Sequence, residues 1–267
     1  MSFPSTARDQ APGQPEASPP RLALVPPAQM LPGLTVVLPC FNEAENVVDA
    51  VRRATVAAAA VSDAFEIVVV DDGSTDATAQ LASRLADADP RVRLVVHVGN
   101  RGYGAALRSG IAAATMPWIF LTDADLQFDL GELAEFVPHA DSADLLIGWR
   151  IARRDPAIRR ANAAAWNWLV RQCFGLRVRD VDCAFKLMRR DVVQPLPLTS
   201  TGAMISTELL VRATARGARI TEFGVRHLPR VAGEASGADP RVVLRAFREL
   251  GSLRRALRDP ELAAAAG

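Results

Sequence analysis

Short apolar runs alternate with longer segments of helical period along most of the chain. The runs are rich in β-branched residues and almost continuously apolar, which is typical of strands covered on both faces. The pattern predicts strands at 34–38, 66–70, 92–97, 118–122, 144–147, 184–188 and 220–225. Helices are predicted at 44–60, 76–86, 104–114, 130–137 and 205–215. This order predicts an α/β fold, with a mainly parallel twisted sheet flanked by helices.

The two ends of the chain depart from this rhythm. Residues 1 to 33 are crowded with Pro, Ser, Ala and Gln, so a disordered tail is expected there, and the Ala-rich residues 259 to 267 are expected to fray. A single domain is expected at 34–258. Its first half is 34–150. Its second half, 151–258, carries arginines on a predicted helix around Trp166 and Trp168 and on a predicted basic amphipathic helix over residues 240 to 257.

The composition narrows the class of protein. Of 267 residues, 49% are hydrophobic, which is enough to bury a core and argues against a disordered or collagen-like chain. The net charge of +1 argues against a nucleic-acid partner. The total is neutral by cancellation, since residues 34–144 hold 7 basic and 17 acidic side chains and residues 145–190 hold 11 and 3. The first half therefore suits a metal and the second suits phosphates.

The cysteines and the hydropathy of the chain indicate in which cellular compartment the protein is expected. Cys40, Cys173 and Cys183 are scattered, so neither a disulfide framework nor a zinc site is expected, and a reducing compartment is the default. No apolar run approaches the length of about 18 residues that a membrane span requires. No signal peptide is visible either, so we expect a cytoplasmic protein.

Acidic side chains follow three of the predicted strands. The segments are Pro39-Cys40-Phe41-Asn42-Glu43, Asp71-Asp72-Gly73-Ser74-Thr75-Asp76 and Asp123-Ala124-Asp125-Leu126-Gln127. In parallel α/β sheets ligands bind beyond the carboxyl ends of the strands, so we expect these segments to converge on one edge. Unpaired, such carboxylates would repel, and their desolvation would cost on the order of several kcal/mol. A cation, or hydroxyl and amino groups of a ligand, should compensate them.

The spacing of Asp123, Asp125 and Gln127 predicts a metal site. Alternate residues on an extended strand end point the same way, so three oxygen ligands can face one Mg²⁺ or Mn²⁺ ion, which would suit a diphosphate. The alternative is a helix N-cap formed by Asp125 or Asp129. Residues 72 to 76 likewise fit either a ligand loop or a capped turn.

The stretch Gly99-Asn100-Arg101-Gly102-Tyr103-Gly104 predicts a tight loop that opens a helix. Its glycine spacing differs from the dinucleotide-binding fingerprint, and it follows the third strand instead of the first, which disfavours an NAD-dependent enzyme. Close packing of the loop against the sheet is the preferred interpretation, and a phosphate contact is the alternative.

Four segments, in this order and spacing, resemble the family-2 nucleotide-sugar glycosyltransferases of GT-A fold. They are Pro39-x-Phe41-Asn42-Glu43-x-x-Asn46, Val70-Asp71-Asp72-Gly73-Ser74-x-Asp76-x-Thr78, Asn100-x-Gly102-x-Gly104-x-Ala106 and Asp123-Ala124-Asp125-Leu126-Gln127. The resemblance extends over roughly residues 34 to 250 and is closest to the dolichyl- or polyprenyl-phosphate mannosyltransferases and glucosyltransferases.

The resemblance implies roles for individual residues. A nucleoside pocket would be lined by Pro39, Phe41, Glu43, Val70 and Asp72, with Asp72 accepting a hydrogen bond from the base. The metal and the diphosphate would be held by Asp123, the Ala124 backbone, Asp125 and Gln127.

Two arginines match further family segments. Arg150 matches a Gly-x-Arg motif and Arg230 an R-x-x-G-x-S loop, and both would contact phosphates, for which a guanidinium fork is well suited. In the polyprenyl-phosphate branch a lysine follows the serine of that loop. This chain has no lysine there, Ser236 stands where the alignment from Arg230 places it, and Arg241 could supply the charge instead.

The acceptor decides whether a general base is needed. A lipid phosphate is already ionised at neutral pH, whereas a hydroxyl must lose a proton to a carboxylate. The best candidate is Asp182, in a segment that resembles the family's D-x-x-x-G-F-[KR] motif with Ala184 in place of glycine. Asp182 could equally be a cap or an ion-pair partner of Lys186. With Asp125 and Arg150, it completes the expected catalytic set.

The leading hypothesis is a metal-dependent inverting transfer of a hexose from GDP-mannose or UDP-glucose to polyprenyl phosphate. The alternatives are transfer to a hydroxyl of a soluble or glycan acceptor, and a nucleotide-binding protein without catalysis. Helices that combine Arg with Trp suit an anionic bilayer surface. We therefore expect a peripheral protein at the inner face of the membrane, with a separate anchoring protein as a further partner. The alternative is a helix packed on the sheet with a solvated basic face.

Overall fold

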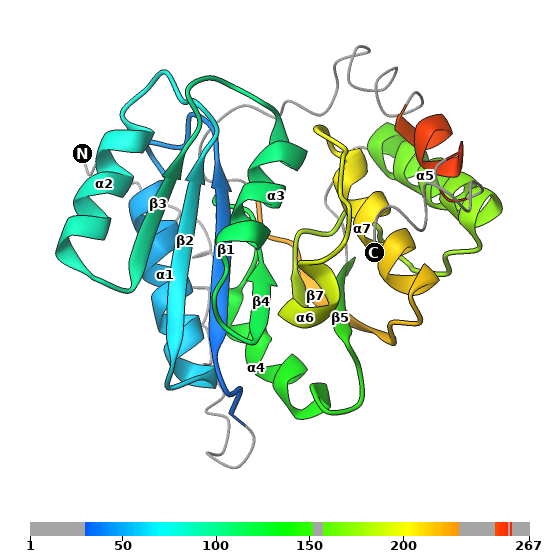
Figure 1. Cartoon of the computed structure of the whole chain (residues 1–267), viewed down its shortest axis with the longest axis horizontal. Coiled ribbons are helices and arrows are strands. Elements are labelled where there is room, and N and C mark those ends of the chain that lie inside the picture. Colours follow the sequence, from blue (N-terminus) through cyan, green and yellow to red (C-terminus); the bar gives the residue numbers. More distant parts are fainter. Residues whose placement is uncertain (1–29, 152–156, 230–248, 256, 258–267) are drawn as a thin grey trace, which may run out of the picture.

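The computed structural model describes residues 30–151, 157–229, 249–255 and 257, with residues 157–163 described as backbone only. Seven strands form one sheet, in the order β3-β2-β1-β4-β6-β5-β7 (Figure 1). The strands are β1 (Leu34–Cys40), β2 (Phe65–Asp71), β3 (Val92–Val96), β4 (Trp118–Leu121), β5 (Leu145–Ile151), β6 (Lys186–Arg189) and β7 (Ile220–Arg226).

The sheet is mainly parallel, as predicted, and all seven predicted strands are present within a few residues of their expected bounds. Strand β1 pairs in parallel with β2 and β4, β2 with β3, and β5 with β7. Strand β6 lies between β4 and β5 and runs antiparallel to both. A short apolar run has the same pattern in either direction, so the sequence could not predict this reversal.

Helices cover both faces of the sheet (Figure 1). One face carries α1 (Val47–Val61), α2 (Thr78–Ala88) and α4 (Leu133–Phe136), the last flanked by 3₁₀ turns η2 (Leu130–Glu132) and η3 (Val137–His139). The other face carries α3 (Tyr103–Ala113), α5 (Ala157–Phe174), α6 (Arg190–Val193) and α7 (Met204–Ala215). Strand β1 contributes side chains to the hydrophobic cores on both faces, since Val36 and Leu38 face α1 whereas Val37 faces α3. Burial on both faces explains why these strands are continuously apolar.

Packing begins slightly before the predicted domain boundary at residue 34. Leu31 is buried in the core, its N–H donates to Val61 O at 2.8 Å, and its carbonyl accepts from Ser62 Oγ at 3.0 Å. Residues 30 to 33 are therefore not part of a disordered tail. The rest of both predicted tails lies outside the described residues, and so does the predicted helix at 240–257 except for its described residues 249–255 and 257.

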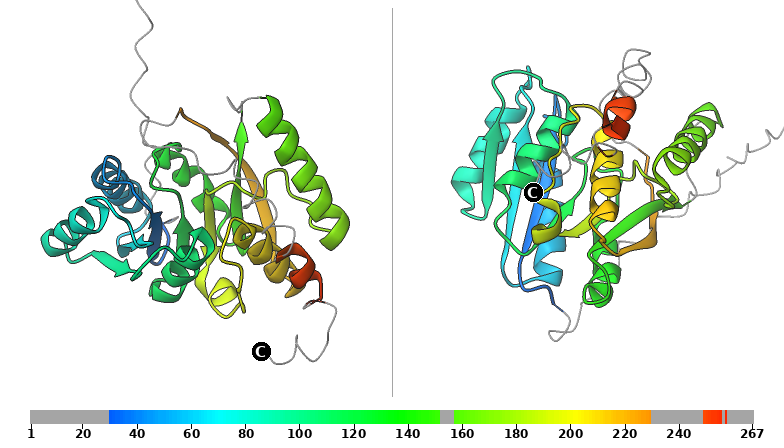
Figure 2. Two further views of the ribbon diagram at one scale, coloured as in Figure 1. Left: turned by 90° about the horizontal axis from the view of Figure 1, so that it is seen from above. Right: turned by 45° about the vertical axis from the view of Figure 1, so that its right-hand side comes forward.

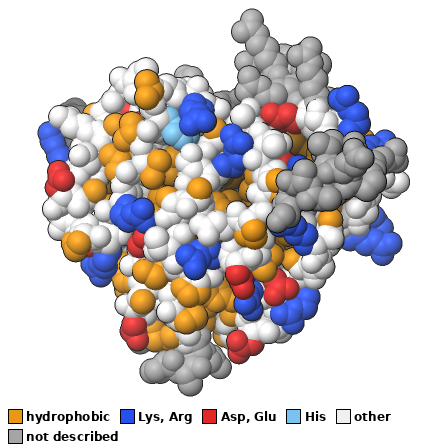
Figure 3. Space-filling model, in the orientation of Figure 1, with side chains coloured by type: hydrophobic (Ala, Val, Ile, Leu, Met, Phe, Trp, Pro, Cys, Tyr) orange, Lys and Arg blue, Asp and Glu red, His pale blue; other side chains and the backbone are white. Residues whose placement is uncertain are grey.

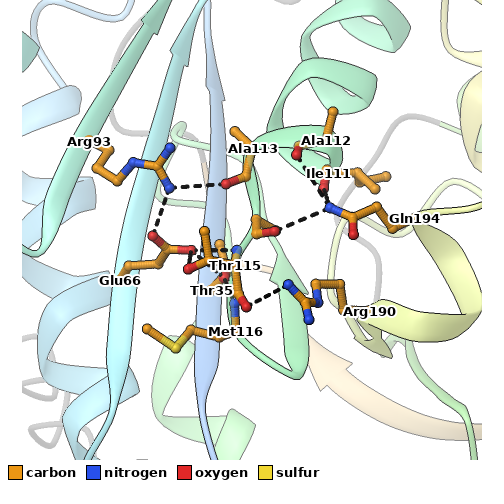
Figure 4. A network of polar contacts seen from close by, with 11 residues as sticks. Thr35, Glu66, Arg93, Ile111, Ala112, Ala113, Thr115, Met116, Arg190 and Gln194 are labelled. Carbon is orange, nitrogen blue, oxygen red and sulfur yellow. Dashed lines mark hydrogen bonds and ion pairs between the residues drawn. The ribbon is translucent and has the colours of Figure 1, made fainter.

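A polar network fixes the amino edge of the sheet, opposite the acidic loops (Figure 4). The buried Glu66 carboxylate on β2 accepts from Thr35 Oγ1, from the N–H and hydroxyl of Thr115, all at 2.8 Å, and from Arg93 at 2.9 Å. Gln194 donates to three carbonyls at the C-terminal end of α3. These contacts join three strands to α3 and the α6 segment.

Among the described residues visible in Figure 3, basic, acidic and hydrophobic side chains are interspersed. Helix α5 lies at the β5–β7 end of the sheet, away from α1 and α2 (Figure 2). None of the helices in the described ranges combines the length and the apolar character that crossing a bilayer requires.

Candidate active site

The acidic loops meet at the carboxyl edge of the sheet, as predicted. Strands β2, β1 and β4 are consecutive neighbours, and Cys40 at the end of β1 is in register with Asp71 at the end of β2. Burial, and then the charges of Glu43, Asp71, Asp123 and Asp76, raise the pKa of the Cys40 thiol. Carboxylates from all three loops are therefore within electrostatic reach of one sulfur atom.

The loops after β1 and β2 are tied to each other. The Asn42 N–H donates to Ser74 Oγ at 2.9 Å, and Asn42 Oδ1 accepts from the Thr75 N–H at 2.8 Å. The Ala44 N–H donates to Asp76 Oδ2 at 3.1 Å. Ser74 and Asp76 therefore hold backbone of the neighbouring loop, whereas the N-cap of α2 is Ala77, which makes no side-chain capping bond.

The residues predicted to line a nucleoside pocket lie together at this edge. Pro39 and Val70 are in register on neighbouring strands and are buried. The Phe41 side chain is 44% exposed, which leaves a ring available at the edge. Glu43 is half-buried, and its Oε2 accepts from Asn46 Nδ2 at 2.7 Å.

Asp72 is buried, and it anchors the glycine-containing loop. Its Oδ1 lies 2.6 Å from His97 Nδ1 and accepts from the Arg101 N–H at 2.9 Å, while its Oδ2 accepts from the Gly102 N–H at 2.8 Å. His97 Nε2 in turn lies 2.9 Å from Ser109 Oγ on α3. The predicted contact of Asp72 with a base stays a prediction. In the structure, Asp72 also holds the backbone of the glycine-containing loop.

The glycine-containing loop packs closely, as predicted, but its contacts are with residues 200–202, which precede α7, and not with the sheet. The Gly104 N–H donates to Thr201 O at 2.8 Å, and a Cβ at Gly104 would lie 2.6 Å from Ser200 O. Gly102 has φ +94°, and a Cβ there would collide with Thr201 O. The two glycines are therefore required by close backbone approach, and at Gly102 also by a positive φ.

Asp123 and Asp125 follow β4 and form a closely spaced carboxylate pair. Burial and the charge of Asp125 raise the pKa of Asp123 to about 7, although a hydrogen bond from Tyr103 lowers it. That bond runs from Tyr103 Oη to Asp123 Oδ1 at 2.9 Å. Such a raised pKa marks negative charge that the protein itself does not fully compensate.

The backbone between the two carboxylates and Gln127 is unusual. Ala124 and Asp125 are buried, and Leu126 has φ +61°. Leu126 and Asn42 are the two non-glycine residues with positive φ in the described part of the chain, and both lie in loops of this edge. Leucine rarely adopts this conformation, and strain of this kind clusters at functional sites.

The donor set at the end of β4 fits a divalent cation. Asp125 Oδ1 accepts from the Gln127 N–H at 3.1 Å, and Gln127 Nε2 donates to Leu228 O at 3.3 Å, so the amide oxygen is the Gln127 atom suited to a metal. The described residues contain no cluster of three or more His, Cys, Asp or Glu able to hold a metal alone. Two carboxylates and an amide suit Mg²⁺ or Mn²⁺, which usually retain water or phosphate ligands. Of the two residues considered as an N-cap, Asp129 caps the 3₁₀ turn η2, because its side chain accepts from the Gly131 N–H.

Arg150 lies on β5, and its guanidinium pairs with Asp180. Nε lies 2.7 Å from Asp180 Oδ2 and Nη2 lies 2.8 Å from Oδ1. Burial lowers the pKa of Arg150, but the hydrogen bonds and the charge of Asp180 raise it overall. The Arg150 guanidinium is thus held by Asp180, and its contact with a phosphate stays a prediction. Arg230, the other predicted phosphate ligand, lies outside the described residues, as do Ser236 and Arg241.

Asp182 is exposed on a loop that the protein holds firmly. The buried Lys186 Nζ donates to the carbonyls of Val181, at 3.1 Å, and Cys183. Asn167 of α5 accepts from the Val181 N–H at 3.3 Å. The charge of Asp182 acts on Lys186, in the direction that raises its pKa, whereas burial lowers the pKa of Lys186 overall.

Three residues of this region were missed by the sequence-based prediction of the site. Tyr103, His97 and Asp180 contact Asp123, Asp72 and Arg150, respectively. Tyr103 is the only tyrosine in the chain and stands between two glycines, which is a signal the sequence did contain. The roles of His97 and Asp180 depend on contacts with residues 25 and 30 positions away, which no local pattern reveals.

Comparison with known proteins agrees with this arrangement. Residues 35–196 match the profile of glycosyl transferase family 2. An uncharacterized glycosyltransferase of Mycobacterium tuberculosis is 34% identical over 206 residues, covering 76% of this chain and 88% of that protein. An undecaprenyl-phosphate 4-deoxy-4-formamido-L-arabinose transferase of Salmonella choleraesuis is 29% identical over 212 residues, covering 79% of this chain and 64% of the relative.

Solved structures share the fold at low sequence identity. Glucosyl-3-phosphoglycerate synthase from Mycobacterium tuberculosis, in complex with Mn²⁺, uridine-diphosphate-glucose and phosphoglyceric acid, superposes with a TM-score of 0.61 at 20% identity, covering 82% of this chain and 80% of that one. The architecture, the loops at the carboxyl edge and the family match lead to one conclusion: this chain belongs to glycosyl transferase family 2 and has the GT-A fold.

Proposed function

We propose that this glycosyltransferase moves a hexose from a nucleotide sugar, GDP-mannose or UDP-glucose, to a polyprenyl-phosphate lipid with inversion. The observation that carries the proposal is the pair of Asp123 and Asp125 at the end of β4, next to the loops of β1 and β2 that would take the nucleoside. A donor lying across this edge would present its base to Phe41 and Asp72 and its diphosphate to the carboxylate pair.

We propose that Mg²⁺ or Mn²⁺ is held by Asp123, Asp125 and Gln127. When bound, the cation would neutralise the charge that develops on the departing diphosphate. The two carboxylates supply negative charge that a cation would balance. The solved structure that contains Mn²⁺ with uridine-diphosphate-glucose supports the choice of metal. The positive charge of Arg150, which acts on Asp123, would offset part of the negative charge at the site, and Arg230 would contact the diphosphate.

A lipid phosphate is the proposed acceptor because it needs no general base. It is ionised at neutral pH, and the Salmonella relative is named for undecaprenyl phosphate. Exposed apolar and basic side chains at the β5–α5 end support an approach to a membrane surface. Trp168 is 63% exposed and Ile151 is 42% exposed, and Arg171 and Arg179 are exposed as well. We propose peripheral association with the inner face of the membrane, with a separate anchoring protein as a further partner.

The test is direct. The purified protein is incubated with Mn²⁺, labelled GDP-mannose or UDP-glucose, and polyprenyl phosphate, and the product is extracted into organic solvent. We expect a labelled lipid product that Asp125→Ala abolishes. The matched control is Asp129→Asn, which changes a carboxylate of the same loop while keeping a good N-cap residue, and it should retain transfer. Failure of every donor to label the lipid would contradict the proposal.

A hydroxyl acceptor is the second candidate, and exposure of the Asp182 carboxylate favours it. In that case Asp182 would accept the proton of the attacking hydroxyl. The solved relative with phosphoglyceric acid bound shows that the fold accommodates a water-soluble acceptor in that protein. Turnover only with water-soluble acceptors, lost in Asp182→Asn, would support this candidate over the lipid.

A further inference from the structure

The proposed nucleoside and metal sites stand two strands apart. Asp72 follows β2 and Asp123 follows β4, and β1 lies between them. At the usual spacing of neighbouring strands, this separation is about 10 Å. Among the described residues, the two carboxylates make no direct contact with each other, so any mechanical link between them must run through other residues.

One short loop touches both carboxylates. Asp72 accepts from the backbone N–H groups of Arg101 and Gly102. The next residue along the chain is Tyr103, which begins α3 and donates its phenol proton to Asp123 Oδ1 at 2.9 Å. Two consecutive N–H groups on one carboxylate fix the direction in which the chain leaves the loop, and hence where the tyrosine ring starts.

The surroundings leave this loop little freedom. On one side, His97 joins Asp72 to Ser109 of α3, so the anchor and the helix that carries Tyr103 are held together. On the other side, the Gly104 backbone contacts Thr201 with no room for a Cβ. The Tyr103 ring packs against the core formed with α3 and α7. A displacement at Asp72 must therefore move the phenol or break one of these contacts.

We propose that Tyr103 is a positioning residue for the metal-binding carboxylate of Asp123, and that the loop from Arg101 to Tyr103 couples Asp72 to that carboxylate. The phenol occupies Oδ1 and orients Oδ2 toward the cation. A hydrogen bond of this kind to a ligating carboxylate typically accounts for about 10- to 100-fold in metal affinity. The inference rests on the metal site proposed above.

The first experiment measures Mn²⁺ affinity without nucleotide, by electron paramagnetic resonance of the free ion. Tyr103→Phe removes one hydroxyl and keeps the ring, and we expect it to weaken Mn²⁺ binding by about tenfold. Phe174→Leu is the matched control, because it alters another partly buried aromatic ring that packs against the same core as Tyr103, and it should leave Mn²⁺ affinity unchanged. If Tyr103→Phe binds Mn²⁺ as the wild type does, this inference is wrong and the metal site stands. If the wild type binds no Mn²⁺, both are wrong.

The second experiment uses the fact that Tyr103 is the only tyrosine in the chain. Isotope-labelled tyrosine therefore gives a single ring signal in the NMR spectrum, which reports the hydrogen bond to Asp123. We expect Mg²⁺ to shift this signal, and Asp72→Asn to shift it in the absence of any metal or nucleotide. If Asp72→Asn does not fold, Ser109→Ala makes the same test by releasing His97 from α3. A signal that stays in place in the folded variant would overturn the coupling.

Discussion

Arg150 and Asp180 form a two-point ion pair that lies largely inside the protein. The two N–O distances are 2.7 and 2.8 Å, and the side chains are 15% and 7% exposed. The Arg150 N–H also donates to Asp180 Oδ2 at 3.4 Å. The pair thus connects β5 with the loop that carries Asp182.

We expect Asp180→Asn to lower the free energy of unfolding by about 3 kcal/mol, because it leaves a buried guanidinium without its counter-charge. Arg189 and Asp191 make the same two-point contact on the surface, with side chains 43% and 64% exposed. Asp191→Asn is therefore the matched control, and it should cost less than about 1 kcal/mol. Urea denaturation measures both values, and equal losses would contradict a special role for the buried pair.

Gly104→Ala should destabilise the protein by about 1–3 kcal/mol, because the added methyl would meet the backbone oxygens of Ser200 and Gly202 at 2.6 and 2.8 Å. Gly99→Ala, in the same loop, places its methyl in open space and should be tolerated. Thermal unfolding of the two variants provides the comparison. A Gly104→Ala protein as stable as the wild type would show that the loop does not need this close approach.

Glu66 should make stability depend on pH. Burial raises the pKa of Glu66, but hydrogen bonds from Thr115, Arg93 and Thr35 lower it below its ordinary value of 4.5 overall. An acid with a depressed pKa in the folded state stabilises the fold above its unfolded value, and this contribution is lost as the pH falls through the folded value. We expect Glu66→Gln to cost about 2 kcal/mol at pH near 7, with a smaller difference from wild type at acid pH (Figure 4). Urea denaturation across this pH range measures it, and a difference independent of pH would contradict it.

Trp168 should contribute to binding at a membrane surface. Its ring is 63% exposed on α5, and tryptophan is favoured at the bilayer interface. We expect Trp168→Ala to reduce flotation with anionic liposomes without loss of stability. Val96 is 56% exposed on β3 at the opposite end of the sheet, so Val96→Ala is the control and should float like the wild type (Figure 1). A wild-type protein that stays in the soluble fraction with lipid present would argue against peripheral binding.

The sequence alone determined the elements and the acidic edge of this protein. Strands β1, β2 and β4 are buried on both faces, so their apolar runs are unmistakable, and parallel strands place the residues after them at one edge. For this reason the grouping of Phe41, Asp72 and Asp123 could be predicted from local pattern and the order of segments.

Tertiary structure decided which side chains pair with which. Arg150 matches a motif of phosphate ligands, and in the structure its guanidinium pairs with Asp180. Asp72 accepts hydrogen bonds from the loop that ends at Tyr103. These partners are brought together by strand order and by the reversed strand β6, which follow from packing of the whole sheet. A hydrogen bond depends on distances of a few tenths of an ångström between segments remote in sequence, and only the folded chain fixes those distances.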